Sequence, residues 1–333
     1  MPGMVGGFGN FFVPLLIGAC HNLNSFFYTI INKNKISNIL KQRNNINNKL
    51  NQIKNISLDS HKKQSLYLNA YLAGLFEGDG YIIISNKNKT RQNVVIGITF
   101  NLKDLPLCEH LKNIIEDGWI RLKNKENACV LIFYTDNSII KFVSLINGYL
   151  RSPKLSKFNL VIDYLNVKYS LNLPKYNIDI SDIKNNNWFA GFVDADGGFY
   201  IRYTDKKKLR IGCELRIEQR MIDPSSGLSY ESLFLKIAEL LGTKLEISKH
   251  NDKSYYLVRG NNRKSLSLIL NYFSFFSLYS SKYLDYQNWS QTAQLLLENK
   301  AYSVENKKII YELKHSMNNK RIMFDWSHLN NLK

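Results

Sequence analysis

Two acidic residues, each near the end of a nine-residue segment, are the part of the sequence best suited to chemistry. The segments read LAGLFEGDG at residues 72–80 and FAGFVDADG at 189–197, and their last acids are Asp79 and Asp196. The apolar starts and terminal glycines predict helices that stop at the glycine. The helix dipole disfavours a carboxylate there by roughly 0.3–1 kcal/mol. Two such carboxylates brought together need a cation, and their oxygens suit Mg²⁺, which also binds substrate phosphates.

Small residues four apart in each segment predict how the two helices pack. Gly74 and Gly78 share one helix face, as do Gly191 and Ala195. Glycine inside a helix costs about 1 kcal/mol relative to alanine, and close backbone packing would offset that cost. We therefore expect the two helices to pack against one another. If they lie side by side in parallel, Asp79 is brought close to Asp196. The alternative to a catalytic role is that both segments are ordinary helix ends.

The two segments resemble the paired motif of the LAGLIDADG homing endonucleases, and the resemblance covers about residues 67–290. It implies an α+β fold of two pseudo-symmetric αββαββα halves, whose curved antiparallel sheets form a DNA-binding saddle. It also implies that Asp79 and Asp196 are catalytic and bind the divalent metal, expected to be Mg²⁺. Glu77 and Asp194 match an earlier acid of the motif, which is not a metal ligand in the family.

The same resemblance implies three helper residues. Lys154 ends a segment, Gly148–Lys154, that recurs in the family with a basic residue near the metal, and Lys282 is the choice for the second half. Gln219 takes the place of a polar residue that positions water. Its counterpart in the first half is expected to be Asn101 or Lys103. For each of these, a solvated surface residue is the alternative.

Hydrophobic periodicity predicts the elements that position these residues. Each motif helix is followed by two strands, a helix, two more strands and further helices. In the first half the ranges are helix 65–78, strands 81–85 and 94–102, helix 105–117, strands 119–123 and 128–134, and helices 137–147 and 157–166. In the second half they are helix 188–195, strands 199–203 and 208–220, helix 230–241, strands 244–249 and 254–259, and helices 265–276 and 281–299.

The strands are expected to carry DNA specificity, because alternate side chains of a strand share one face and a β-ribbon fits the major groove. Arginine can read guanine there, and Gln or Asn can read adenine. Candidate residues on the strands are Arg202, Arg210, Glu214 and Arg216. The alternative is that these residues simply form the solvent-exposed face of a half-buried sheet and contact no DNA. Hairpin residues expected to contact phosphates are Lys87, Lys89, Arg91, Lys206, Lys207 and Lys208.

Composition favours a polyanionic partner. Across 333 residues, 45 Lys and Arg face 27 Asp and Glu, a formal net charge of +18, which points to nucleic acid or an anionic membrane surface. The 4 cysteines have no CxxC spacing, and the histidines form no metal-binding group, so a zinc site and a disulfide framework are disfavoured.

The N-terminal region differs from the rest. Residues 1–20 are apolar and resemble a piece of cytochrome c oxidase subunit 1, which implies an intron reading frame continuous with an upstream exon and synthesis in the mitochondrion. Residues 21–66 are expected to be a basic, Asn/Lys-rich linker. The remaining domains are expected at 67–170 for the first half, 171–187 for a connector and 188–333 for the second half.

The function that the resemblance implies is that of a monomeric, Mg²⁺-dependent endonuclease with no obligate protein partner. It would cut a double-stranded DNA target site at an intron-less allele and so promote homing of its intron. The main rival is an RNA maturase that helps to splice its own intron, alone or in addition. An inactive remnant that still binds DNA is a third reading.

Overall fold

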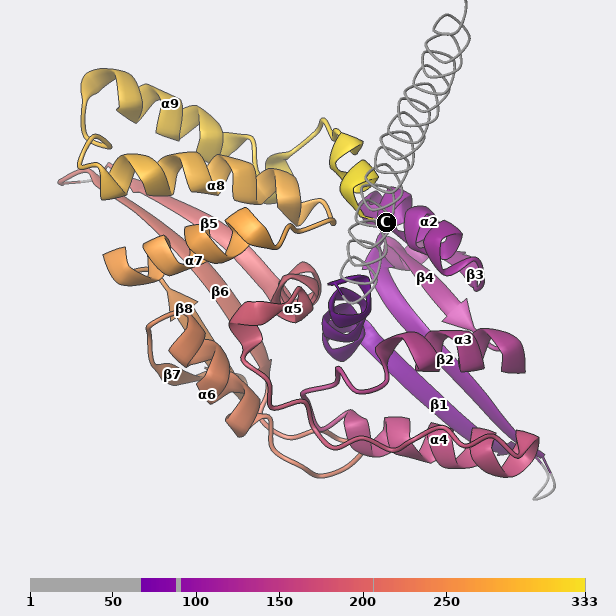
Figure 1. The fold of residues 1–333 in the computed structure, drawn as a ribbon. Helices are drawn as coiled ribbons and strands as arrows, with labels where there is room; N and C mark the ends of the chain where they lie inside the picture. Colours follow the sequence, from indigo (N-terminus) through magenta and orange to yellow (C-terminus); the bar gives the residue numbers. More distant parts are fainter. Residues whose placement is uncertain (1–66, 88–90, 206, 333) are drawn as a thin grey trace, which may run out of the picture. The chain divides into compact units, whose positions relative to one another are not determined.

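The computed structural model describes residues 67–87, 91–205 and 207–332, except for the side chains of residues 86–92. The segments 1–20 and 21–66, Lys89, Lys206 and the side chains of Lys87 and Arg91 lie outside the described residues. Gln64–Lys333 form one compact unit. This unit contains two four-stranded antiparallel sheets with helices packed on them, so the expected α+β class of two repeated halves is confirmed (Figure 1).

Two motif helices meet between the sheets. The first is helical at residues 67–79, and the second is α5 (Trp188–Asp196). A Cβ placed on Gly74 would lie 2.8 Å from the backbone nitrogen of Phe192, and one placed on Gly191 would lie 2.9 Å from that of Leu75. The added Cβ at either position would also overlap a carbonyl oxygen of the opposite helix. The expected close packing is therefore present, and at these positions only glycine fits it.

The first half builds its sheet in the order β1-β2-β4-β3. Strand β1 begins directly after Asp79 and pairs with β2, Gly80 opposite Ile98. The helices bury Leu107, Leu111, Phe142 and Phe158 in the core. The elements are β1 (Gly80–Lys87), β2 (Arg91–Asn101), α2 (Leu105–Ile115), β3 (Trp119–Lys123), β4 (Ala128–Phe133), α3 (Asp136–Ile146) and α4 (Leu155–Tyr169).

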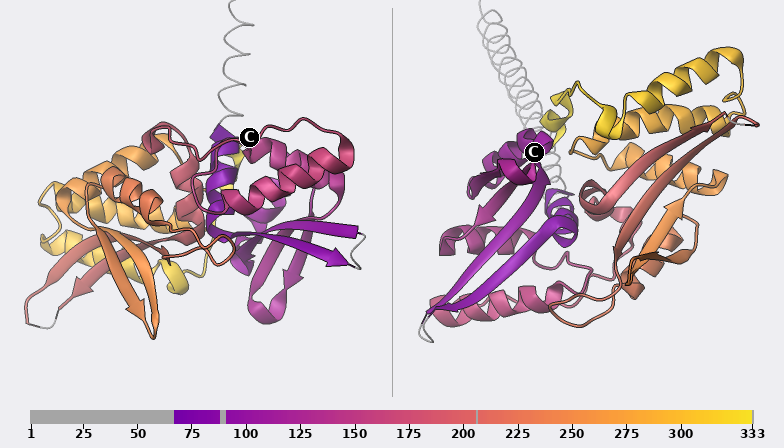
Figure 2. Two further views of the ribbon diagram at one scale, coloured as in Figure 1. Left: turned by 90° about the horizontal axis from the view of Figure 1, so that it is seen from below. Right: turned by 180° about the vertical axis from the view of Figure 1, so that it is seen from behind.

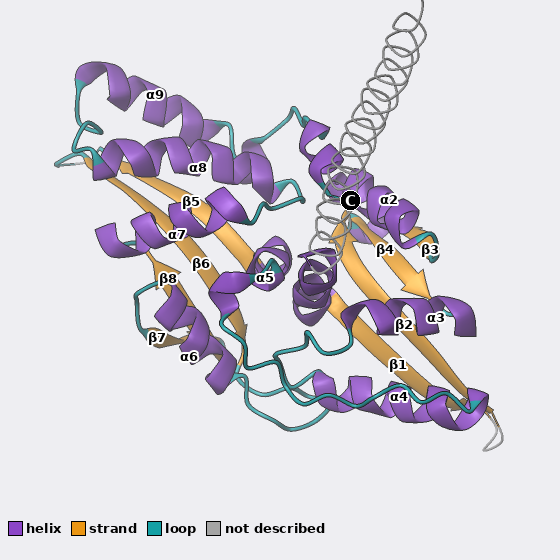
Figure 3. Cartoon of the chain, viewed as in Figure 1, coloured by secondary structure: helices purple, strands orange, loops and turns teal. Residues whose placement is uncertain are grey.

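The second half repeats this topology with the sheet order β5-β6-β8-β7, and Gly197 of β5 pairs with Ile217 of β6. The helices lie on one face of each sheet and leave the other face open (Figures 2 and 3). The elements are β5 (Gly197–Thr204), β6 (Arg210–Arg220), α6 (Glu231–Leu240), β7 (Leu245–His250), β8 (Lys253–Gly260), α7 (Arg263–Phe275), α8 (Lys282–Leu297) and α9 (Val304–His315).

Several predicted boundaries were wrong. The first hairpin was expected to be a loop from Asn86 to Asn93, but β1 reaches Lys87 and β2 starts at Arg91, so neither basic residue belongs to the loop. In the second hairpin β6 starts at Arg210, later than expected. Helix α9 was not predicted, because Ile310 is its sole buried residue and its apolar periodicity is weak. Among the described helices, none has the length and apolar character needed to cross a bilayer.

The last residues return to the first half. A short 3₁₀ helix at Ser327–Asn331 buries His328 and Leu329. The His328 ring packs on Tyr283, and its Nε2 lies 3.0 Å from the carbonyl oxygen of Tyr279. The carbonyl oxygen of Leu332 lies 2.8 Å from Nε2 of His110 on α2. The C-terminal segment thus contacts both halves.

We expect Gly191→Ala to lower the free energy of unfolding by roughly 3 kcal/mol or more, because the new methyl group would meet backbone atoms that cannot move aside. The measurement is urea unfolding followed by circular dichroism. Gly212→Ala is the matched control, since a Cβ there meets no atom within 4 Å. Similar small losses in both variants would contradict the packing described above.

Candidate active site

Asp196 is the last residue of α5, so its side chain lies where the motif helices end and the sheets begin. Its Oδ2 accepts a hydrogen bond of 2.7 Å from Nε2 of Gln219. The same oxygen lies 3.4 Å from the position that a Cβ added to Gly78 would occupy. The carboxylate therefore borders the end of the other motif helix. Burial and the nearby charge of Asp79 raise the pKa of Asp196 to about 6, while Lys282, Lys154 and Gln219 oppose the increase.

Asp79 occupies the matching place on the first motif helix. Its side chain is exposed and forms no hydrogen bond or ion pair with the described part of the chain. Part of this residue is open to solvent, but the surrounding protein displaces water from the carboxyl and so raises its pKa, against the opposing charges of Lys282 and Lys154. The structure thus brings Asp79 and Asp196 into one electrostatic cluster with the two predicted lysines.

The two lysines make equivalent contacts at the ends of the motif helices. Nζ of Lys154 donates to the carbonyl oxygens of Phe76, Gly78 and Gly80 at 3.3, 2.8 and 2.7 Å. Nζ of Lys282 donates to the carbonyl oxygens of Val193 and Ala195, which occupy the same positions in the second motif. Each ammonium group therefore caps the negative end of a helix while its charge reaches the carboxylates. Burial lowers the pKa of Lys154, and the charge of Asp196 is the largest opposing effect.

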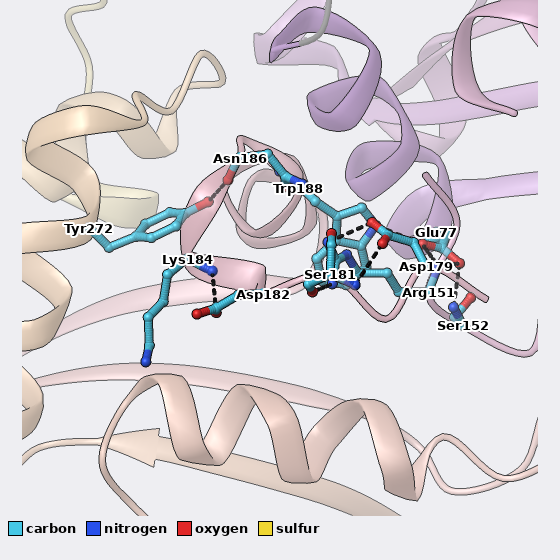
Figure 4. A network of polar contacts seen from close by, with 10 residues as sticks. All are labelled: Glu77, Arg151, Ser152, Asp179, Ser181, Asp182, Lys184, Asn186, Trp188 and Tyr272. Carbon is cyan, nitrogen blue, oxygen red and sulfur yellow. Dashed lines mark hydrogen bonds and ion pairs between the residues drawn. The ribbon is translucent and has the colours of Figure 1, made fainter. Parts of the chain in front are cut away.

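Glu77, the earlier acid of the first motif, is fully buried and serves as a hydrogen-bond acceptor (Figure 4). It accepts from the backbone nitrogens of Arg151 and Ser152, and from Nε1 of Trp188 on the other motif helix at 2.7 Å. Arg151 in turn forms an ion pair of 2.6 Å with Asp179 in the connector. Burial raises the pKa of Glu77, and these donors oppose the increase.

Asp194 repeats this arrangement in the second half. It accepts hydrogen bonds from the backbone nitrogens of Tyr279 and Ser280, and from the hydroxyl of Tyr71 on the first motif helix at 2.8 Å. Burial raises its pKa, again against the donors. An aromatic residue early in each motif helix thus binds the buried acid of the other helix, so Glu77 and Asp194 hold the two halves together and fix the segments that carry the lysines.

Asp104 and Asp223 were missed by the sequence analysis. Both are buried, and they follow equivalent positions on β2 and β6. Oδ1 of Asp104 accepts a 2.6 Å hydrogen bond from the backbone nitrogen of Ser281, next to Lys282 in the other half. The equivalent of Ser281 is Pro153, which has no N–H to donate, and Asp223 instead accepts from Ser225 and Ser226 in its own turn. Comparing the halves position by position would have revealed this pair.

The expected counterpart of Gln219 was wrong. Strand register places Ile98 opposite Gly80 and Ile217 opposite Gly197, so Gln219 corresponds to Phe100. Phe100 is buried and apolar. Asn101 instead accepts a hydrogen bond from the backbone nitrogen of Lys103 and caps a 3₁₀ turn. Among the described residues, a side-chain amide therefore contacts Asp196, and none contacts Asp79.

The predicted DNA-contacting residues whose side chains are described belong to the second sheet and its first hairpin. Arg202, Arg210, Glu214 and Arg216 occupy alternate positions on the open face of the second sheet. Lys207 and Lys208 are exposed in the turn that follows β5. Arg216 forms a 2.8 Å ion pair with Glu218.

The donor set fits a divalent cation shared with a substrate. Within the described chain, no group of three or more His, Cys, Asp or Glu side chains could hold a metal ion by itself. Asp79 and Asp196 instead supply two carboxylates that repel one another and make no ion pair there. Mg²⁺ is commonly held by one or two carboxylates, with substrate phosphates and water completing the octahedron.

We expect Glu77→Gln to lower the free energy of unfolding by roughly 2–3 kcal/mol, because the amide NH₂ would face an N–H donor in a buried site. Urea unfolding at pH 7.5 measures the effect. Glu116→Gln on the exposed surface is the control and should change stability by no more than about 0.5 kcal/mol. Equal effects would show that Glu77 is not an essential acceptor.

Asp196→Asn is expected to stabilise the metal-free protein at pH 7.5. Because the folded-state pKa of Asp196 is raised to about 6, ionising this carboxyl in the folded protein costs stability as pH rises from about 4 to about 6. Asparagine avoids that cost and can still accept from Gln219. Thermal unfolding with a chelator should give a Tm higher by roughly 2–4 °C at pH 7.5 and little difference at pH 4. A lower Tm at pH 7.5 would contradict this account.

Sequence comparison finds relatives over most of the described unit. The LAGLIDADG endonuclease family model matches residues 72–165 and 189–293. "Intron-encoded DNA endonuclease aI3" of Saccharomyces cerevisiae is 28% identical over 275 residues, which cover 72% of this chain and 66% of that protein. "Probable intron-encoded endonuclease 4" of Neurospora crassa is 30% identical, with 74% and 43% covered. "Intron-encoded RNA maturase bI4" of S. cerevisiae is 34% identical, with 57% and 26% covered. The chain thus spans less than two thirds of the full length of these relatives.

Solved structures share the fold. The LAGLIDADG homing endonuclease I-GzeII in complex with its DNA target gives a TM-score of 0.62 at 19% identity, covering 76% of this chain and 99% of that one. I-LtrWI bound to target DNA gives a TM-score of 0.62 at 18% identity, covering 77% and 99%. I-SmaMI bound to uncleaved DNA in the presence of calcium ions gives 0.57 at 19% identity, covering 75% and 98%.

Proposed function

The chain belongs to the LAGLIDADG endonuclease family, and from this premise we propose that it is a site-specific DNA endonuclease. It makes a double-strand break at an intron-less allele and thereby promotes homing of its intron. The observation that carries the proposal is the placement of Asp79 and Asp196 in one cluster at the ends of two closely packed helices. Relatives named as intron-encoded endonucleases support the intron origin.

Asp79 and Asp196 are the catalytic residues and would hold Mg²⁺ in this proposal. When bound, the metal supplies Lewis-acid stabilisation of the scissile phosphate and lowers the pKa of a bound water. The Gln219 amide orients the Asp196 carboxylate through its 2.7 Å hydrogen bond. Metal binding requires the ionised form of Asp196. Because the pKa of this carboxyl is raised to about 6, activity is expected to fall as the pH drops below about 6.

Lys154 and Lys282 serve as the basic residues of the site. Each is fixed by the carbonyl oxygens at a helix end, so its positive charge is already in place before DNA binds. Such prearranged charge stabilises the negative charge that develops on a phosphate in the transition state. Arg202, Arg210, Glu214 and Arg216 contact bases in this proposal, and the hairpin lysines with Arg91 contact phosphates.

The assembly follows from the duplicated fold. Both halves, 67–170 and 188–333, are supplied by one chain through the connector 171–187, so we infer a monomer with no obligate protein partner. The apolar segment 1–20 and the linker 21–66 precede this unit in the sequence. The resemblance of segment 1–20 to cytochrome c oxidase subunit 1 supports synthesis in the mitochondrion.

The test is cleavage of a DNA fragment spanning the uninterrupted exon junction, with and without Mg²⁺. Asp79→Asn and Asp196→Asn should each reduce double-strand cleavage by roughly 10³-fold or more, because each removes a metal-binding carboxylate. Binding of the fragment, measured with a chelator, should change little. Asp163→Asn on the outer surface of α4 is the matched control. Cleavage by the double variant at the wild-type rate would falsify the assignment.

An RNA maturase is a second candidate, because a relative named as an intron-encoded RNA maturase is 34% identical over 190 residues. Splicing assistance needs the fold but not the two carboxylates. Splicing of the chain's own intron RNA by the Asp79→Asn, Asp196→Asn double variant would therefore show a separate activity.

A further inference from the structure

The open faces of the two sheets differ sharply in chemistry. The faces correspond by register, since β1 and β5 begin directly after the carboxylates and pair with β2 and β6 in the same way. In both halves the helices lie on the opposite face (Figure 2). A duplex that reaches the carboxylates would therefore lie along both open faces.

The first open face is apolar across its centre. One row of directly paired residues is Tyr81, Gly97, Ile132 and Trp119, and the next row outward is Ile83 and Val95. The Tyr81 ring lies over Gly97, where an added Cβ would come within 2.5 Å of it. Trp119 is 58% exposed and Ile83 is 50% exposed. Among the described side chains of this face, the two cationic ones, Arg121 and Lys123, lie on the edge strand β3.

The second open face carries charge at the same places. The row equivalent to Tyr81, Gly97 and Ile132 is Gly198, Arg216 and Arg259, and the next row is Tyr200 and Glu214. Each of the two arginines is held by an acid on the same face, Arg216 by Glu218 and Arg259 by Glu246. Their side chains are 35% and 38% exposed. The acids bind Nη2 of Arg216 and Nε and Nη2 of Arg259, which leaves Nη1 of each guanidinium for a ligand.

We propose, resting on the endonuclease function above, that the two halves read their half-sites by different chemistry. The first half recognises thymine methyl groups, and its half-site is rich in A·T pairs. The second half recognises guanine through Arg216 and Arg259. The bound partner is one asymmetric DNA duplex, with an apolar readout on one side of the cut and a hydrogen-bonded readout on the other.

The major groove explains why these two faces suit those bases. Thymine alone presents a methyl group there, and apolar side chains contact it favourably. Guanine presents two acceptors, O6 and N7, which match an arginine fork. An acid that binds part of the guanidinium restricts the rotamers of the arginine, so less conformational entropy is lost when the guanidinium meets a base.

The experiment uses base analogues that change one atom group at a time. A preferred duplex is first selected by cleavage from a library of random sequence. Deoxyuridine for thymidine then removes the methyl groups, and 7-deazaguanine removes the N7 acceptors, in one half-site at a time. Affinity of the full chain is measured with a chelator. We expect each contacted methyl to contribute about threefold to fourfold, in the first half-site only. Loss of N7 should weaken binding roughly tenfold in the second half-site only.

Matched variants assign each half-site to a protein half. Val95→Thr keeps the shape and β-branching of the side chain but replaces a methyl with a hydroxyl, so it should reduce the sensitivity to deoxyuridine. Arg216→Lys keeps the charge but loses the fork, so it should reduce the sensitivity to 7-deazaguanine and leave the deoxyuridine effect unchanged. Thermal unfolding confirms that both variants are folded.

Two outcomes would overturn the proposal, and they are distinguishable. Equal sensitivity of both half-sites to both analogues, or the reverse pairing of analogue and half, shows that the enzyme binds DNA without this division. Failure of the wild-type chain to bind or cleave any duplex contradicts the proposed endonuclease function, and with it the proposed difference in base recognition between the two halves.

Discussion

The close approach of two helix backbones at Gly74 and Gly191 is the constraint on which the rest of the structure depends. Any larger side chain at either position would push the helices apart, and the carboxylates at their ends would separate. The same contact sets the relative position of the two sheets, because β1 and β5 continue directly from the helices. One packing interaction therefore determines both the chemistry at the centre and the spacing of the surfaces beside it.

Buried acids complete this interface in a reciprocal way. Glu77 accepts from Trp188 and Asp194 accepts from Tyr71, so each motif helix supplies an acid and an aromatic donor to the other. Both acids also accept the backbone N–H groups of the loop that leads to a capping lysine. Burying a carboxylate is costly unless it is fully hydrogen-bonded, and here the donors are already fixed by the fold. The penalty is thereby offset, and the lysines are positioned by the same bonds.

Much of this could be predicted from the sequence, because the information is local and repeated. The glycine spacing predicts the helix contact, and the alternation of apolar residues predicts the paired strands, although their ends shift where hairpin residues such as Lys87 extend the ladder. Gln219 was expected to position water, and its hydrogen bond to Asp196 was not predicted. Its supposed counterpart in the first half was not found, because strand register, which a single sequence does not reveal, places Phe100 there. Asp104 was missed because its partner, Ser281, is distant in the chain. Helix α9 was missed because most of its surface is not buried.

The location of the tryptophans has a spectroscopic consequence. Trp188 is fully buried, packs on Phe192 and donates its indole N–H to Glu77 across the contact between the halves, whereas Trp119 is exposed on an open sheet face. Indole emission shifts to longer wavelength when water replaces a protein environment. A chain that keeps Trp188 alone would report optically on separation of the halves, and one that keeps Trp119 alone would report on occupation of that face.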